Sequence, residues 1–272
     1  MTIVANKCPF CGHADVYINE LARGEFIVEC NGCYSGGPIC GDVMDAITAW
    51  NKAVRNDGAP MTTTERPTAT MKSSIQETLP VIGTAMGAGF YAGRILIDGD
   101  PFALIVAPKA DGEHKPTIWI PNYKDVPGAK SYNDGLANTQ AMAEAGSNLA
   151  KWALGLEIGG ANDWYLPAQD ELEIIYRNLK PTTDKNSCWG RSGINLSAFE
   201  PTRPYTPDFP PQTPAEAFQQ GGAEAFTADW HWSSTQHASY SDYAWSQSFA
   251  RGTQDYLTDH KLRARAVRRL PI

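Results

Sequence analysis

Four cysteines near the N-terminus carry the clearest chemical signal in the sequence. They form two Cys-x-x-Cys pairs with eighteen residues between the pairs: Cys8, Cys11, Cys30 and Cys33. Two pairs at this separation are typical of a tetrahedral zinc site with four thiolate ligands. Because four thiolates leave no open position for water, we expect a structural zinc ion rather than a catalytic one. The ion would supply folding free energy that so small a module cannot obtain from its apolar core.

The other reactive residue types do not combine into a catalytic motif. Cys40 and Cys188 lie far apart in the sequence, so a paired redox site has little support. His231, His237 and His260 lie near serines and aspartates, but the chain has no Gly-x-Ser-x-Gly elbow and no glycine-rich phosphate-binding motif. We therefore expect that the protein is not an enzyme.

A second group of candidate residues lies near the C-terminus. Stretches 237–243 and 251–256 are rich in Tyr, Ser, Asp, Gln and Gly, the mixture that antibody-like binding surfaces use. The residues predicted to bind a ligand or partner are Tyr240, Asp242, Tyr243, Trp245, Gln247, Arg251, Gln254 and Tyr256. The alternative is that they are ordinary solvated loop residues.

The composition indicates a globular, acidic protein. The chain has 272 residues, of which 42% are hydrophobic and 10% aromatic, enough for one large domain or two unequal ones. Its net charge of −7 argues against nonspecific electrostatic binding of the whole chain to nucleic-acid phosphates. The start of the chain lacks the apolar region of a secretory signal, and no run approaches the ~18 apolar residues that span a bilayer. We expect synthesis in the cytoplasm and no membrane insertion.

Four arginines in the last extended run offer a local exception to this acidic character. They alternate with small and apolar residues, as in a half-buried final strand, and can pair with the protein's own carboxylates. A nucleic-acid patch is the less favoured alternative. The arginines are Arg263, Arg265, Arg268 and Arg269.

The elements that position the cysteines are short. Residues 16–18 and 25–29 can form a hairpin between the two pairs. Asp42 can cap a helix, with Asp45 at the third position. The apolar stripe of this helix would be Met44, Ile47, Trp50 and Val54. From 57 to 78 the composition changes to Thr, Ser, Pro and small residues without an apolar period, which predicts a linker. The predicted domains are therefore 1–56 and 79–272.

The larger domain begins with β-rich runs. Residues 90–97 and 101–107 flank Asp98-Gly99-Asp100 and predict a hairpin, and residues 117–120 can add a third strand. Apolar residues then recur at helical spacing over 136–156, which predicts one core-facing helix.

A second helix is expected directly after Trp164-Tyr-Leu166. Pro167 suits a first helical position, and Asp170 and Glu171 suit the first turn. Apolar residues recur at i, i+3, i+4 and i+7, which predicts an amphipathic helix. They are Leu172, Ile175, Tyr176 and Leu179.

Residues 181–228 form a long insertion without a secondary-structure pattern. Six prolines lie between 201 and 214, with Tyr205 and Phe209 among them. Proline lowers the entropy lost on ordering, so the insertion can present its aromatic residues to a partner. Alternatively, it wraps over the domain's own core. Three extended runs follow, at 230–235, 243–249 and 262–269.

Motifs within these elements resemble a known family. In order they are Trp164-Tyr-Leu-Pro-x-x-x-Glu-Leu, Trp232-Ser-Ser, Ala244-Trp and Arg265-Ala-Val-Arg. Over residues 76 to 272 the chain resembles the C-type-lectin-like domain found in bacterial collagen-like adhesins and phage tail proteins. The resemblance implies an α+β fold with two helices, small antiparallel sheets and long loops. It also implies trimers, with ligands bound on the C-terminal strand face. Glu200-Pro-Thr and Asn162-Asp-Trp depart from the calcium motifs, so metal-mediated sugar binding is not expected.

The N-terminal part resembles a different family. Lys7-Cys-Pro-Phe-Cys-Gly, Gly36-Gly-Pro and Asp45-Ala-Ile-Thr-Ala-Trp-Asn resemble the Lar family of restriction-alleviation proteins over residues 5 to 56. Tyr34 stands where that family more usually has glycine. The resemblance implies a zinc ribbon followed by a helix.

Together these features predict a non-enzymatic phage virion protein of the tail, baseplate or fibre. Its C-type-lectin-like domain would serve host attachment by binding a cell-surface receptor, glycan or protein, or would bind a neighbouring tail protein. The alternative is an intracellular anti-restriction regulator that acts through the zinc ribbon.

Overall fold

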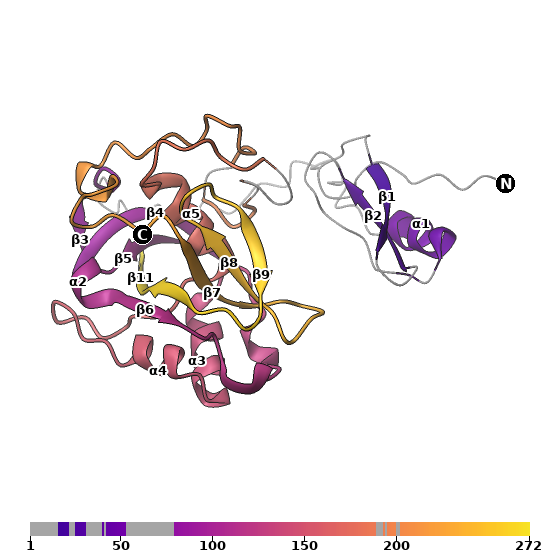
Figure 1. The fold of residues 1–272 in the computed structure, drawn as a ribbon, viewed down its shortest axis with the longest axis horizontal. Helices are drawn as coiled ribbons and strands as arrows, with labels where there is room; N and C mark the ends of the chain where they lie inside the picture. Colours follow the sequence, from indigo (N-terminus) through magenta and orange to yellow (C-terminus); the bar gives the residue numbers. More distant parts are fainter. Residues whose placement is uncertain are drawn as a thin grey trace, which may run out of the picture. The chain divides into compact units, whose positions relative to one another are not determined.

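The chain forms two compact units, Met1–Glu77 and Thr78–Ile272. The computed structural model describes residues 16–21, 25–30, 40, 42–52, 79–188, 193, 195–199 and 202–272 (Figure 1). The predicted linker 57–78 lies outside these residues. Helices and strands occur together, which confirms the α+β class. None of the helices in the described ranges has the length and apolar character needed to cross a membrane.

The first unit contains the predicted hairpin and helix. Strand β1 (Val16–Leu21) pairs antiparallel with β2 (Glu25–Cys30), and α1 spans Val43–Lys52. Asp42 caps α1 as predicted, because the Asp45 N–H donates to its Oδ1 at 2.9 Å. Apolar residues of β2 and α1 then form a small core: Val28, Ala46, Ile47 and Trp50.

The second unit begins with the predicted hairpin of β4 (Gly89–Ile97) and β5 (Asp100–Val106). Asp98 and Gly99 connect them with φ values of 53° and 90°. Two left-handed residues in succession are what a tight two-residue hairpin turn requires, and Asp-Gly adopts them readily. With β3 (Ala85–Met86) and β11 (Val267–Pro271) the hairpin forms a four-stranded antiparallel sheet in the order β11-β5-β4-β3.

The other sheet of this unit has five strands in the order β6-β10-β7-β8-β9. Their bounds are β6 Glu113–Thr117, β7 Trp230–Gln236, β8 Ala244–Ser248, β9 Gln254–Leu257 and β10 Leu262–Arg265. Only the β10–β7 pair is parallel. The prediction of a strand over 117–120 was wrong, since β6 ends where that strand was to begin. Trp119 instead turns inward, and its Nε1 donates to the Ser233 carbonyl at 2.8 Å.

The single helix predicted over 136–156 is two helices, α3 (Gly135–Ala145) and α4 (Asn148–Leu154). Gly146, with φ 107°, ends the first helix. Ser147 starts the second by accepting from the Ala150 N–H, and its hydroxyl donates to the Trp119 carbonyl at 2.6 Å. The second unit therefore has more than the two helices expected, because α5 and the short α2 (Lys109–Gly112) add to this pair.

Helix α5 (Gln169–Leu179) matches the predicted helix except at its start. Pro167 lies before the helix rather than at its first position, and Glu171 reaches back so that its Oε2 accepts from the Ala168 N–H at 2.7 Å. The helix is amphipathic as expected, but its polar face is covered as well, because Asp170, Glu171 and Glu173 are as buried as the apolar stripe.

Residues 181–228 cover this helix in the part of the insertion that the structure describes. Tyr205, Phe218 and Phe226 are buried in the same core as α5 and β4. In Figure 1 the orange chain passes over α5. The interpretation that the insertion wraps over its own domain is therefore confirmed for these residues.

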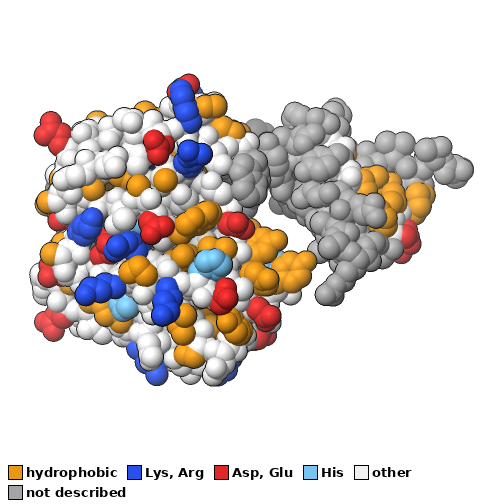
Figure 2. All heavy atoms as spheres, in the orientation of Figure 1, with side chains coloured by type: hydrophobic (Ala, Val, Ile, Leu, Met, Phe, Trp, Pro, Cys, Tyr) orange, Lys and Arg blue, Asp and Glu red, His pale blue; other side chains and the backbone are white. Residues whose placement is uncertain are grey.

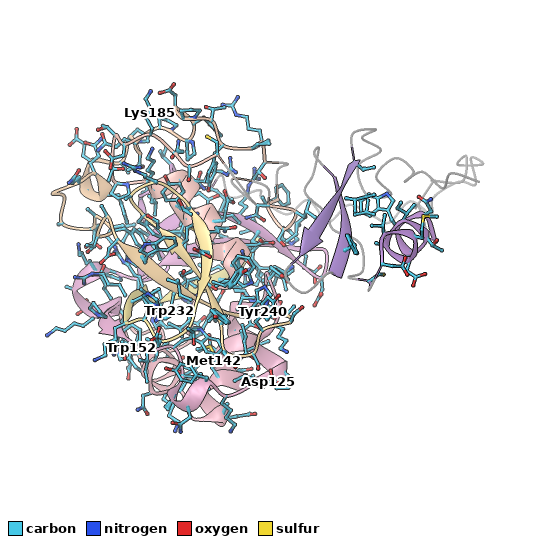
Figure 3. All side chains as sticks on the ribbon, turned by 45° about the vertical axis from the view of Figure 1, so that its right-hand side comes forward. Asp125, Met142, Trp152, Lys185, Trp232 and Tyr240 are labelled. Carbon is cyan, nitrogen blue, oxygen red and sulfur yellow. The ribbon has the colours of Figure 1, made fainter. Side chains whose placement is uncertain are left out.

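A second core lies between α3, α4 and the five-stranded sheet. Trp232 of β7 is fully buried there with Met142 of α3. Both residues, and Trp152 of α4 at the edge of this core, are labelled in Figure 3. Trp232 of β7 and Leu262 and Ala264 of β10 belong to this core, so the loops of the five-stranded sheet project from a packed base.

Candidate ligand-binding surface

The β8–β9 hairpin separates the predicted binding residues into two groups. Trp245 lies opposite Tyr256, and Gln247 lies opposite Gln254, two residues further along each strand. Side chains two residues apart point to the same face of a strand. One face of the hairpin therefore has an aromatic end and a glutamine end.

Five rings meet at the aromatic end, and we call them the aromatic cluster. They come from the 237–243 loop and from β8 and β9: His237, Tyr240, Tyr243, Trp245 and Tyr256. Ring centroids are 4.8 Å apart for His237 and Tyr240, and 5.3 Å for Trp245 and Tyr256. Tyr243 and Tyr256 meet edge to face at 5.5 Å. Such contacts favour a fixed arrangement of the rings.

His237 organises the loop that supplies two of these tyrosines. Its Nδ1 accepts from the Ser239 N–H at 3.2 Å and from the Tyr240 N–H at 3.0 Å. Burial lowers the pKa of His237, and the charge of Lys130 lowers it further. The ring is therefore neutral at pH 7, with Nδ1 free of a proton. Sequence reasoning missed this role, because a histidine that accepts from nearby backbone has no fixed sequence signature.

The aromatic cluster is open to solvent at its tyrosines. The exposed fraction is 50% for Tyr240 and 37% for Tyr256. Asp242, which precedes Tyr243 in the 237–243 loop, is also exposed. Figure 2 shows hydrophobic side chains gathered with acidic ones around them on the face that carries β9. In Figure 3, Tyr240 lies toward the same end of the unit as Asp125, and Lys185 lies at the opposite end.

The glutamine end is built differently. Gln247 is 1% exposed, and its Nε2 lies 3.4 Å from the Tyr205 hydroxyl and 3.3 Å from the Gly252 carbonyl. Gln254 accepts from Gln169 of α5 at 3.2 Å. The prediction that Gln247 offers its side chain to a partner is thus corrected, because the residue faces the interior. Arg251 is exposed at this end, away from the aromatic cluster.

The predicted zinc ligands fall mostly outside the described residues. Cys8, Cys11 and Cys33 lie outside them, and Cys30 is the last residue of β2. The register pairs Cys30 with Val16, the first residue of β1. The chain therefore enters β1 and leaves β2 at the same end of the hairpin.

The four arginines near the C-terminus are all paired within the unit, as predicted. Arg263 contacts Glu113 at 3.1 Å, and Arg265 contacts Glu224 at 2.5 Å. The remaining two pairs are Arg268 with Asp163 at 2.7 Å and Arg269 with Asp134 at 2.8 Å. The predicted single strand is two strands, β10 and β11, which carry ion pairs rather than an open row of cations.

The fold and this surface define the second unit as a compact α+β domain that presents a cluster of aromatic side chains on loops held by a packed sheet. Within this class, the chain belongs to the Lcl C-terminal domain family, whose model matches residues 114–268. The match runs from β6 to β11 and includes the whole aromatic cluster. Neither a curated protein nor a solved structure matches the chain.

Proposed function

We propose that residues 79–272 form a C-type-lectin-like recognition domain of a phage virion protein. The domain binds a host cell-surface receptor or a neighbouring tail protein, as a homotrimer, and does not catalyse a reaction. The observation that carries the proposal is the exposed aromatic cluster at the end of the β8–β9 hairpin. Exposed aromatic residues on a rigid base give contact area at small entropic cost.

The scaffold beneath the cluster supports this function. Trp245 and Tyr256 belong to hydrogen-bonded strands, so their backbones are fixed before a partner arrives. The 237–243 loop is held by His237 and by Gln236, whose Nε2 donates to the Ser241 carbonyl at 2.7 Å. Preorganised contact groups lose less entropy on binding.

Binding to host cells and to purified tail particles tests the proposal. We expect the double variant Tyr240→Ala/Tyr256→Ala to lose at least about tenfold in affinity, as is usual when central aromatic contacts are removed. Point variants are needed, because deletion of 230–272 would remove β7 to β11, which are four strands of the five-stranded sheet and one edge strand of the other.

Phe199→Ala is the matched control, since Phe199 is 39% exposed and lies in the 181–228 insertion. Equal binding by the wild type and the double variant, with unchanged melting temperature, would rule out the aromatic cluster as the recognition surface. Mass spectrometry of purified particles tests the virion assignment separately, because a virion protein must be found in them.

We also propose that Cys8, Cys11, Cys30 and Cys33 bind one structural zinc ion in an N-terminal zinc ribbon. Support comes from the donor chemistry and from the β1–β2 register, in which Cys30 lies opposite Val16, the residue at which the chain enters the hairpin. Metal analysis of the purified full chain should give one zinc per chain. Cys30→Ser should lower this content, and Cys40→Ser should leave it unchanged.

The resemblance of residues 5–56 to restriction-alleviation proteins favours a second candidate function, intracellular anti-restriction. A restriction-efficiency assay with the full chain separates the two. If Cys8→Ser/Cys30→Ser abolishes protection from restriction and Tyr240→Ala/Tyr256→Ala does not, the regulatory function is the correct one.

A further inference from the structure

We propose that the aromatic cluster binds an arginine or lysine side chain of a protein partner by cation–π contact, and that Asp242 and Asp255 supply the opposing charge. This inference rests on the proposed function, because it specifies which chemical group of the partner occupies the same surface.

Cation–π contacts are a recurrent device within this domain. Arg203 lies 3.7 Å from the ring centre of Phe209, and Arg265 lies 4.8 Å from that of Phe226. The described part of the chain places no arginine or lysine over a ring of the aromatic cluster. The cluster thus presents the π surface that attracts cations, on tyrosine and tryptophan rings, without a cation of its own.

The charges around the cluster favour a cation. Asp242 is exposed beside Tyr243. Asp255 precedes Tyr256 on β9, so its side chain leaves the other face of the strand, and its Oδ1 accepts from the Tyr256 N–H at 2.8 Å. The negative charge of Asp255 also contributes to the raised pKa of Tyr256, after burial and Tyr240. Lys130 also lies at this loop, where its ammonium group donates to the Ala238 carbonyl at 3.3 Å and is paired with Asp125 at 3.2 Å. Neither Asp242 nor Asp255 forms an ion pair with a described residue. A guanidinium or ammonium group of a partner therefore meets the rings of the aromatic cluster together with this negative charge.

The 237–243 loop explains why a protein side chain suits the site. Tyr240 and Asp242 stand at the tip of a loop, while Trp245 and Tyr256 lie on strands behind it. A side chain carried by a partner's surface can reach between these groups while the partner's backbone contacts the exposed loop. Acidic surfaces also accelerate association with basic partners, in keeping with the net charge of −7.

Titration of the full chain with two synthetic peptides tests the inference. One is acetyl-Gly-Arg-Gly-Arg-Gly-amide, and the other carries citrulline, the neutral isostere, in place of both arginines. Proton NMR of the peptide reports ring contact directly, because aromatic faces shift the side-chain methylene signals upfield. We expect this shift for the arginine peptide and roughly fivefold weaker binding of the citrulline peptide, which corresponds to the ~1 kcal/mol of a cation–π contact.

Variants distinguish the two groups that the inference invokes. Tyr240→Ala/Tyr256→Ala should abolish the upfield shift, and Asp242→Asn/Asp255→Asn should weaken binding roughly threefold and reduce its salt dependence. Phe199→Ala is the control and should bind as the wild type does.

Equal affinity for the arginine and citrulline peptides would overturn the inference. In a separate titration with tetramethylammonium, binding of this ion without binding of either peptide would also overturn it. These failures are distinct from failure of the proposed function. If Tyr240→Ala/Tyr256→Ala loses binding to host cells or tail particles while the wild type binds both peptides equally, the aromatic cluster is the recognition surface but does not select a cation.

Discussion

The aromatic cluster and the interior around α5 both contain several tyrosines, but the hydroxyl groups of these tyrosines differ in their contacts. In the interior, three tyrosine hydroxyls have short hydrogen bonds: Tyr165 to Glu171 at 2.6 Å, Tyr176 to Asn186 at 2.6 Å and Tyr205 to Glu173 at 2.8 Å. In the aromatic cluster, the hydroxyls of Tyr240, Tyr243 and Tyr256 make no hydrogen bond to any described residue.

The difference teaches how to separate stability from recognition in this domain. Buried polar groups must be satisfied inside the protein, because each unpaired group costs free energy. Exposed tyrosines need no internal partner and keep their hydrogen-bonding capacity for another molecule. Substitutions in the interior should therefore change the free energy of unfolding, whereas substitutions in the aromatic cluster should change binding.

The largest effect is expected for Glu173→Ala. Glu173 is 1% exposed and accepts from Arg177, Tyr205 and Asn195, with Asn195 at 2.8 Å. Its removal leaves the partly buried guanidinium of Arg177 without its opposing charge and Tyr205 and Asn195 without their acceptor, so we expect a loss of roughly 3 kcal/mol in the free energy of unfolding. Urea unfolding measures this loss.

The matched control is Glu157→Ala, an exposed glutamate in the same unit. It should change the free energy of unfolding by less than about 0.5 kcal/mol. Similar values for the two variants would contradict the structural role assigned to the interior carboxylate.

His231 should make the interior sensitive to acid by a few kcal/mol. It is fully buried against Phe226 and Phe249, and burial lowers its pKa from 6.5 to about 3. A lowered pKa means that the unfolded chain takes up the proton first. The stabilising contribution is therefore complete above pH 6.5 and is lost as the pH falls toward 3.

Urea unfolding at a series of pH values between 7 and 3 measures this dependence. His231→Phe should flatten the curve over this range, whereas His260→Gln should not, because His260 is exposed and paired with Asp259. An unchanged slope in His231→Phe would show that other groups cause the acid sensitivity.

Two glycines with positive φ sharpen the contrast between crowded and open positions. Gly252 has φ 74°, and an added Cβ would overlap the ring of Tyr176. Gly99 has φ 90° with no atom within 4 Å of such a Cβ. Both alanine variants carry a backbone penalty of about 1 kcal/mol, but Gly252→Ala adds an overpacking cost of roughly 1–3 kcal/mol.

Thermal and urea unfolding of Gly252→Ala and Gly99→Ala compare the two positions. The difference between them isolates the packing of Gly252 against α5, since the backbone strain is shared. If both variants lose the same stability, the turn after β8 does not pack against Tyr176 as described.

Much of the fold could be predicted because its signals are local. The Asp98-Gly99 turn and the Asp42 cap depend on residues close in sequence, and both are confirmed. The break between α3 and α4 was missed although its signals are also local, since Gly146 ends α3 with φ 107° and Ser147 caps α4 by accepting from the Ala150 N–H. The apolar period that continues across 136–156 obscured them.

The candidate site divides along the same line. The alternation along β8 correctly places Trp245 and Gln247 on one face, but it cannot say which of them is covered. Gln247 is covered because Tyr205 of the 181–228 insertion packs against it. A contact between residues this far apart in sequence has no periodic signal along the chain. Exposure at the aromatic end depends on the absence of such a covering segment among the described residues.

The smallest effect tests the comparison most directly, because it removes one hydroxyl from each region. Tyr205→Phe leaves the buried Glu173 short of a donor, so we expect a loss of about 1–2 kcal/mol in the free energy of unfolding. Tyr256→Phe removes a hydroxyl without an internal partner and should change stability by less than about 0.3 kcal/mol. Parallel urea titrations give both values. If Tyr256→Phe is as destabilising as Tyr205→Phe, the hydroxyl of Tyr256 forms a contact within the domain. The comparison would then no longer support the aromatic cluster as a binding surface for a partner.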